Sequence, residues 1–162
     1  MEMICFVNNR WIPQLSALLT VVILGACSSS PDESLKVRQF HLREPDAADK
    51  KLAQMVRGEQ MYRLKGAVTL EERKERLGDY YTVTWRARGA QPTHVVMDYQ
   101  QAVTGAKVLS QSRDLSPGVA GGKEEFRVVG DDYNQGGRVL AWRIRLLQGN
   151  RVLAEKRSYL WR

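Results

Sequence analysis

From Asp79 to the last residue, the chain is a series of short segments in which apolar and polar residues alternate. A period of two is typical of a β-strand that buries one face. Turn residues separate the segments at intervals of roughly 8–12 residues, which is typical of an antiparallel sandwich. The predicted strands are Tyr80–Arg88, Thr93–Gln100, Ala106–Ser112, Glu125–Val129, Val139–Leu147 and Val152–Trp161.

The apolar faces of these strands carry two of the four tryptophans. Trp85 and Trp142 each fall on the apolar parity of their strand, so we expect both to be buried between two sheets. Arg143 and Arg145 fall on the opposite face from Trp142 and are expected to point to solvent. The apolar set of that strand is Leu140, Trp142, Ile144 and Leu146.

A further strand is predicted ahead of this region, over Leu35–Arg43. Its first half places apolar residues on one parity, and its second half places them on the other. This change of phase predicts a β-bulge near Arg38 and Gln39.

Residues 45–78 are predicted to form two helices with a short strand between them over 60–65. Pro45 opens the first helix, and Gly58 can close it. Thr69 and Glu72 form a capping box that starts a second, charged helix, which ends near Gly78. The segment 35–78 is therefore expected to pack on a sandwich formed by 79–162. The apolar positions at helical spacing in the first helix are Ala48, Leu52, Met55 and Val56.

The sequence thus predicts a mainly-β fold with one or two short N-terminal helices. The region 79–162 resembles an immunoglobulin-like or fibronectin-type-III-like domain, on the evidence of Trp85, Tyr133 and the final hairpin. Tyr133 is either a tyrosine corner, which ties the connection to the backbone, or an ordinary loop tyrosine. Because paired cysteines are absent from this region, the resemblance is to disulfide-free members.

The N-terminus carries a candidate export signal. An apolar run over 15–24 is too short for a bilayer span, which needs roughly 20 residues. It ends in Leu24-Gly25-Ala26-Cys27, which resembles the lipobox of bacterial lipoproteins. The resemblance implies a signal peptide over 1–26, a lipidated Cys27 and a polar tether over 27–34. The start of translation is left open between Met1 and Met3.

This resemblance also implies a location. Acyl chains on Cys27 would anchor the protein to a membrane, since each buried methylene contributes about 0.8 kcal/mol. Ser28 follows the cysteine, which resembles outer-membrane sorting in enteric bacteria. We therefore expect a cell-envelope protein that is lipid-anchored in the outer membrane and faces the periplasm.

Charge and cysteine content narrow the function. The net charge is +7, and the predicted processing removes one arginine and one glutamate and leaves it unchanged. Either this charge attracts anionic envelope polymers or an envelope protein, or it serves solubility alone. Export and the lack of a recognised motif exclude nucleic acid as a partner. Cys5 lies in the predicted signal and Cys27 carries the lipid, so no disulfide is expected.

Catalytic and metal-binding motifs are missing from the sequence. His41 and His94 lack metal-ligand spacing, and we interpret them as surface or edge residues. Neither a Gly-x-Ser-x-Gly elbow nor a phosphate loop is present, and no cofactor is implied. The chain is therefore interpreted as a non-catalytic structural, binding or adaptor module. The alternative is a small lipid-anchored hydrolase without a recognisable motif.

One surface is a candidate for binding. Arg143 and Arg145 lie on the polar face of their strand, and the closing strand carries Arg157, Tyr159 and Trp161 at one parity. Arginine and large aromatic residues are enriched at protein interfaces. The register of the hairpin decides whether the five residues share a face. The alternative interpretation is a sheet edge that its charges protect from aggregation.

Overall fold

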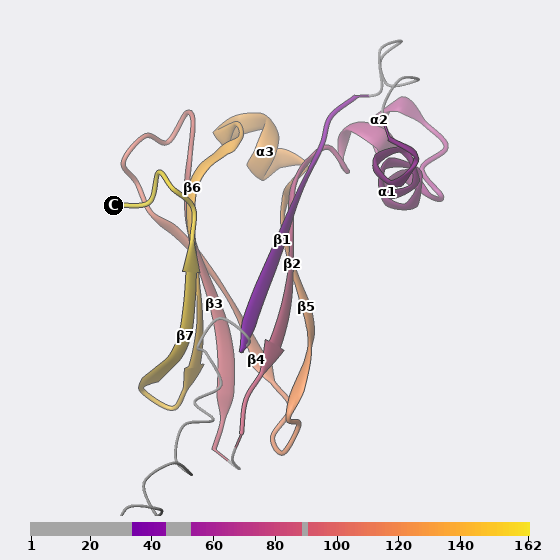
Figure 1. Ribbon diagram of the computed structural model, residues 1–162. Coiled ribbons are helices and arrows are strands. Elements are labelled where there is room, and N and C mark those ends of the chain that lie inside the picture. The colour runs from indigo at the N-terminus through magenta and orange to yellow at the C-terminus, as the bar shows by residue number, and fades with distance from the viewer. Residues whose placement is uncertain (1–33, 45–52, 89–90) are drawn as a thin grey trace, which may run out of the picture.

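The computed structural model describes residues 34–44, 53–88 and 91–162, which form a sandwich of two antiparallel sheets (Figure 1). One sheet has the order β1-β2-β5, with strands Leu35–Leu42, Gly78–Arg86 and Gly121–Val129. The other has the order β4-β3-β6-β7, with strands Leu109–Leu115, Thr93–Gln101, Val139–Gln148 and Arg151–Arg157. The helices α1, α2 and α3 cover Gln54–Leu64, Leu70–Lys74 and Asp131–Gly136.

This strand order confirms the predicted mainly-β, immunoglobulin-like sandwich. As in that fold, the first, second and fifth strands form one sheet, and the third, sixth and seventh lie in the other. The fourth strand pairs with the third rather than with the fifth. Since β1 pairs with β2 along its whole length, the sandwich begins at Leu35 and not at Asp79.

The core between the sheets contains the residues expected from the alternation. Trp85 is only 3% exposed, which confirms its predicted burial. Trp142 packs against the same core but is only half-buried, so its prediction holds in part. The fully buried core residues include Leu35, Tyr81, Val83, Val95, Met97, Phe126, Val128, Ile144 and Leu146.

The bulge predicted in the first strand is absent. β1 pairs with β2 in an unbroken register from Leu35 opposite Trp85 to Leu42 opposite Gly78. The apolar residues change parity because the outer face of this sheet is also covered at one end. Phe40 lies opposite Tyr80, whose ring carries the guanidinium of Arg63 from α1.

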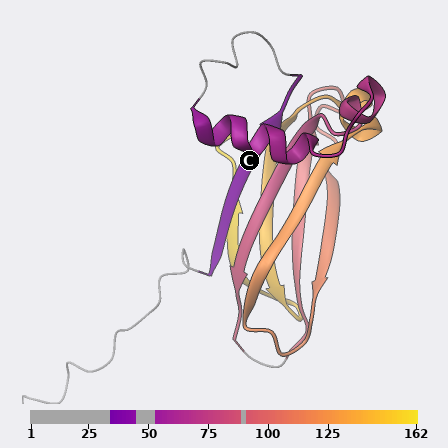
Figure 2. The same cartoon turned by 90° about the vertical axis from the view of Figure 1, so that its right-hand side faces the viewer.

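Helix α1 differs from its prediction in extent and orientation. It continues through Gly58 and includes most of the segment predicted as a short strand. Figure 2 shows α1 lying across β1 and β2 near one end of the sheet. Met55, Met61 and Tyr62 point away, each at least 69% exposed, because polar residues hold the helix in place.

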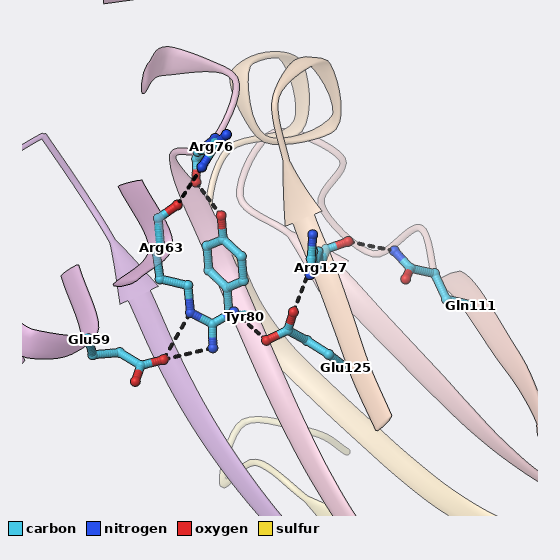
Figure 3. Close-up of polar contacts among 7 residues, drawn as sticks. All are labelled: Glu59, Arg63, Arg76, Tyr80, Gln111, Glu125 and Arg127. Atoms are coloured by element: carbon cyan, nitrogen blue, oxygen red, sulfur yellow. Dashed lines mark hydrogen bonds and ion pairs between the residues drawn. The ribbon is translucent and has the colours of Figure 1, made fainter. Parts of the chain in front are cut away.

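Arg63 is the centre of that polar contact (Figure 3). Its guanidinium bonds the carboxylates of Glu59 and Glu125 and lies 4.1 Å from the centroid of the Tyr80 ring. Arg76 donates to the backbone oxygens of Arg63 and Lys65, 3.1 and 2.6 Å away. The pKa of Arg63 is raised: burial lowers it, but the hydrogen bonds that its guanidinium donates to Glu125 and Glu59 outweigh this effect. The network fixes α1 on the sheet through charge and not through an apolar stripe.

The short α2 agrees with its prediction. Thr69 and Glu72 form the capping box, with the Thr69 hydroxyl accepting from the Glu72 amide at 3.1 Å. None of the residues of α2 is buried, as expected for a charged surface helix. The structure ends this helix at Lys74, and Gly78 already belongs to β2. Within the described parts of the chain, no helix has the length and apolar character to cross a bilayer.

Candidate functional site

The register of the β6–β7 hairpin assembles the candidate binding surface. Gly149 and Asn150 form a two-residue turn, because Gln148 pairs with Arg151. A register shift follows between Leu146 and Leu147 and brings Arg157 opposite Arg143. Without this shift, the two-residue turn would place residue 156 there. The bulge therefore brings Arg157 onto the outer face of the four-stranded sheet beside Arg143 and Arg145, as the binding hypothesis requires.

The sequence predicted that Arg143 and Arg145 point to solvent. In the structure, both side chains are instead bound to a carboxylate. Both donate to Oδ2 of Asp98 on β3, Arg143 Nη2 at 2.9 Å and Arg145 Nη2 at 2.9 Å. Ser110 donates to the other carboxylate oxygen at 3.0 Å. The Asp98 side chain is 8% exposed, against 31% and 27% for the two arginines.

Asp98 stays ionised in this setting. Burial raises its pKa, but hydrogen bonds from Arg143 and Ser110 and the charge of Arg145 outweigh that effect and hold the pKa below its usual range. Replacing Arg143 and Arg145 together would leave this carboxylate buried with Ser110 alone. A double replacement therefore threatens the fold and is a poor probe of binding.

Arg157 is the exposed cation of the group. It stands opposite Arg143 on the neighbouring strand, and its side chain has no ion pair within the described chain. Like charges placed directly opposite one another destabilise a sheet. Asp98 pairs with two of the three guanidinium groups, and Glu155 stands opposite Arg145. Three cations against two carboxylates leave these five residues with one excess positive charge.

The C-terminal residues complete this surface by a route that the sequence pattern did not predict. β7 ends at Arg157 instead of continuing to Trp161. The Ser158 amide then donates to the Trp142 carbonyl at 2.8 Å, and the chain turns. The Trp161 ring reaches the Arg143 guanidinium at 5.0 Å, whereas Tyr159 is 99% exposed. We call Asp98, Arg143, Arg145, Arg157, Tyr159 and Trp161 the arginine face.

Asp98 is the member of this face that sequence reasoning missed. The sequence did contain a sign of its role. Asp98 is an acidic residue between Met97 and Tyr99, in a strand whose alternate positions are apolar. Pairing β3 with β6 was needed to place it opposite Arg143. That pairing joins segments about 45 residues apart in the chain, which alternation alone does not specify.

The second polar group lies at the end of the sandwich near α3. His41 Nδ1 is 3.1 Å from Oδ1 of Asp79, a carboxylate with no exposed area. The other oxygen of Asp79 accepts from the Val139 amide at 2.9 Å. Tyr133, which belongs to α3 and not to a loop, packs its ring against His41 with the centroids 5.8 Å apart and the ring planes tilted by 49°. Within the described chain its hydroxyl makes no hydrogen bond to backbone, so the tyrosine corner is not formed there.

The His41–Asp79 pair bears on the hydrolase alternative, because a histidine beside a carboxylate is one part of a catalytic triad. The contacts of His41 in the described residues include no serine, threonine or cysteine that the pair could activate. Asp79 is instead used to join β2 to the start of β6.

His94 lies opposite Asp114 on the edge pair of the other sheet. In the parts of the chain that the structure covers, three or more metal-ligating side chains do not gather anywhere. The predicted lipid site at Cys27 falls outside the described residues.

Comparisons with known proteins add a distant structural likeness. No protein-family model matches the chain, and no curated protein matches it. Among solved structures, it is similar to an immunoglobulin-like protein from Pseudomonas aeruginosa, with 22% sequence identity and a TM-score of 0.36. That match covers 50% of this chain and 69% of the other. The assignment of the immunoglobulin-like fold therefore rests on the strand order.

Proposed function

We propose that this chain is a lipid-anchored, non-catalytic binding or adaptor module of the bacterial cell envelope. Cys27 is the anchor, and the protein faces the periplasm from the outer membrane. The arginine face binds the partner, which is an envelope protein or an anionic envelope polymer.

One observation carries the proposal: Arg143 and Arg157 face each other across β6 and β7, beside the ring of Trp161. A monomer gains nothing from opposing two cations, whereas an acidic group on a partner would bind both. Trp161 and the exposed Tyr159 supply large rigid surfaces of the kind that interfaces bury. Asp98 orients Arg143 and Arg145 before any partner arrives, which lowers the entropy lost on binding.

The anchor is tested by replacing Cys27 with serine. We expect the Cys27→Ser protein to be released from the membrane or to remain unprocessed, because serine offers no thiol for the diacylglyceryl group. Mass spectrometry of the mature N-terminus and membrane fractionation measure the outcome. Cys5→Ser is the matched control and should leave processing unchanged. A mature N-terminus at another residue, without acyl groups, would contradict the anchor.

The arginine face is tested by Arg157→Ser combined with Tyr159→Ser, which leaves the Asp98 pairs intact. We expect partner recovery after mild detergent extraction to fall by about tenfold, since an interface arginine often contributes more than 1 kcal/mol. Arg38→Ser is the control, because Arg38 is exposed on the outer face of the other sheet. Equal recovery from both variants and the unmodified protein would rule out a binding role for the face.

A further inference from the structure

A second basic site lies at the opposite end of the strands from α1 and α3. It is an open hollow of about 360 Å³ where the start of β1, the end of β2 and the β6–β7 turn meet. This end is the lower one in Figure 1. The hollow is lined by Ser34, Arg86, Ala87, Arg88, Gln148, Arg151 and Leu153.

Among the described residues, the charge of this hollow is of one sign. Three of the seven described residues that line it are arginines, and none of the seven is an aspartate or a glutamate. The side chains of Arg86, Arg88 and Arg151 are exposed, and within the described chain they make no ion pair. They differ in this respect from Arg63, Arg143 and Arg145, each of which is bound to a carboxylate.

The backbone fixes the three arginines around the hollow. The Arg86 amide donates to the Ser34 carbonyl at 2.9 Å, which joins the end of β2 to the start of β1. The Gln148 side chain donates to the Arg88 carbonyl at 3.1 Å, which joins the segment after β2 to the β6–β7 hairpin. Arg151 is the first residue of β7 and pairs with Gln148. The positive charge is therefore held by two strands, β2 and β7, and by the segment that follows β2, and does not arise from a single side chain.

The hollow is also where the chain enters the domain. Ser34 lines it, and Ser34 follows Cys27 by seven positions, with six residues between them. The seven steps from Cys27 to Ser34 span at most about 25 Å, so an anchor at Cys27 keeps this end near the bilayer surface. The far end of β1 lies about 26 Å from this end, at roughly 3.3 Å per residue over its eight residues.

We propose that the hollow of Arg86, Arg88 and Arg151 binds the phosphate of anionic lipid headgroups and orients the domain on its membrane. The inference deepens the proposed function, because its choice of lipid over a free anion rests on the anchor at Cys27. Guanidinium groups bind phosphate oxygens in pairs of parallel hydrogen bonds. An anionic leaflet attracts each arginine near its surface by about 1 kcal/mol. In this orientation, the far ends of the sandwich point away from the bilayer.

The test uses the full acylated chain in two kinds of vesicle, phosphatidylcholine alone and a 3:1 mixture of phosphatidylcholine with phosphatidylglycerol. Phenylglyoxal modifies accessible arginines, and mass spectrometry gives the rate at each position. We expect Arg86, Arg88 and Arg151 to react about fivefold more slowly in the mixed vesicles. Arg138, which is exposed at the other end of the sandwich, is the internal control and should react equally in both.

A variant separates site binding from general attraction to the charged surface. In the Arg86→Gln, Arg151→Gln protein, Arg88 should lose its protection in the mixed vesicles. An Arg138→Gln protein should retain it. Equal rates at all three arginines in the two vesicle types would overturn the proposal. Protection by inorganic phosphate in phosphatidylcholine vesicles, to the same degree, would overturn the choice of a lipid and identify a site for free oxyanions.

The same samples distinguish failure of this site from failure of the anchor. Mass spectrometry reports whether Cys27 is acylated. An acylated chain whose three arginines stay unprotected contradicts the hollow and leaves the anchor intact. An unmodified Cys27 contradicts the anchor. In that event, flotation with the mixed vesicles measures headgroup binding directly, and its absence contradicts the hollow as well.

Discussion

Replacing Trp85 by alanine is expected to lower the free energy of unfolding by about 3–5 kcal/mol, which is enough to unfold a marginally stable domain. The indole is 3% exposed and lies against the backbone of Gly122, where an added Cβ would come within 3.1 Å of its ring. Removing the ring therefore leaves a cavity that the two sheets cannot close without moving. Urea denaturation followed by circular dichroism measures the effect.

Two further variants make this prediction specific. The buried Nε1 of Trp85 has no hydrogen-bond partner in the described chain, so Trp85→Phe loses area but no polar contact and should cost less than alanine. Trp142 donates from Nε1 to Gln39 at 3.2 Å and is only half-buried. Trp142→Ala should therefore also cost less than Trp85→Ala. A larger loss at Trp142 would show that the core is centred elsewhere.

Gly78→Ala is expected to destabilise the protein by about 3 kcal/mol or more, although it adds a single methyl group. Gly78 has φ +141°, and a Cβ there would lie 2.1 Å from the backbone oxygen of Val128. A Cβ is strained at this backbone angle, and it would also clash with β5 in the β2–β5 pair. Urea denaturation gives the magnitude, and faster amide exchange in β2 and β5 would locate the damage.

The matched control for Gly78 is Gly105. It also has a positive φ, of 59°, but a Cβ there meets no atom within 4 Å. Gly105→Ala should cost only about 1 kcal/mol, the penalty of the left-handed conformation itself. Similar losses at the two positions would mean that the close approach of β2 and β5 does not constrain the sheet.

The alternation of apolar and polar residues predicted the strands well where one face of the strand is buried and the other is exposed to solvent. It misjudged β1, because its last residues are covered on the outer face by α1, and a strand with two covered faces does not alternate. It also misjudged Leu140, which is 52% exposed, since a register shift between Gln100 and Gln101 on β3 changes the phase at the start of β6. Such irregularities depend on the partner strand and leave little trace in the sequence of one strand.

Helices and the candidate site depended still more on tertiary contacts. The exposed apolar residues of α1 suggested a buried stripe, yet Arg63 attaches the helix through Glu125 and Tyr80 on the sheet. The outer-face position of Arg143 followed from parity, whereas its partner Asp98 required the β3–β6 register. Arg157 lies opposite Arg143 because of a bulge in the hairpin. The sequence did not decide between the two turn types that would set this register. Local patterns therefore predicted which residues are outside, and long-range pairing decided which of them meet.

The position of β1 also determines how the domain bears mechanical load. β1 is an edge strand that pairs with β2 at eight consecutive positions, and the chain enters it at Leu35. A force pulling on Ser34 along the strand axis, away from the sandwich, would slide β1 along β2. It would therefore load the β1–β2 hydrogen bonds in shear and would not peel the strand from one end. All of its hydrogen bonds then share the load at once, whereas in peeling they would break one after another. An envelope protein pulled between a membrane anchor and a partner would gain resistance to unfolding from this geometry without any added bond.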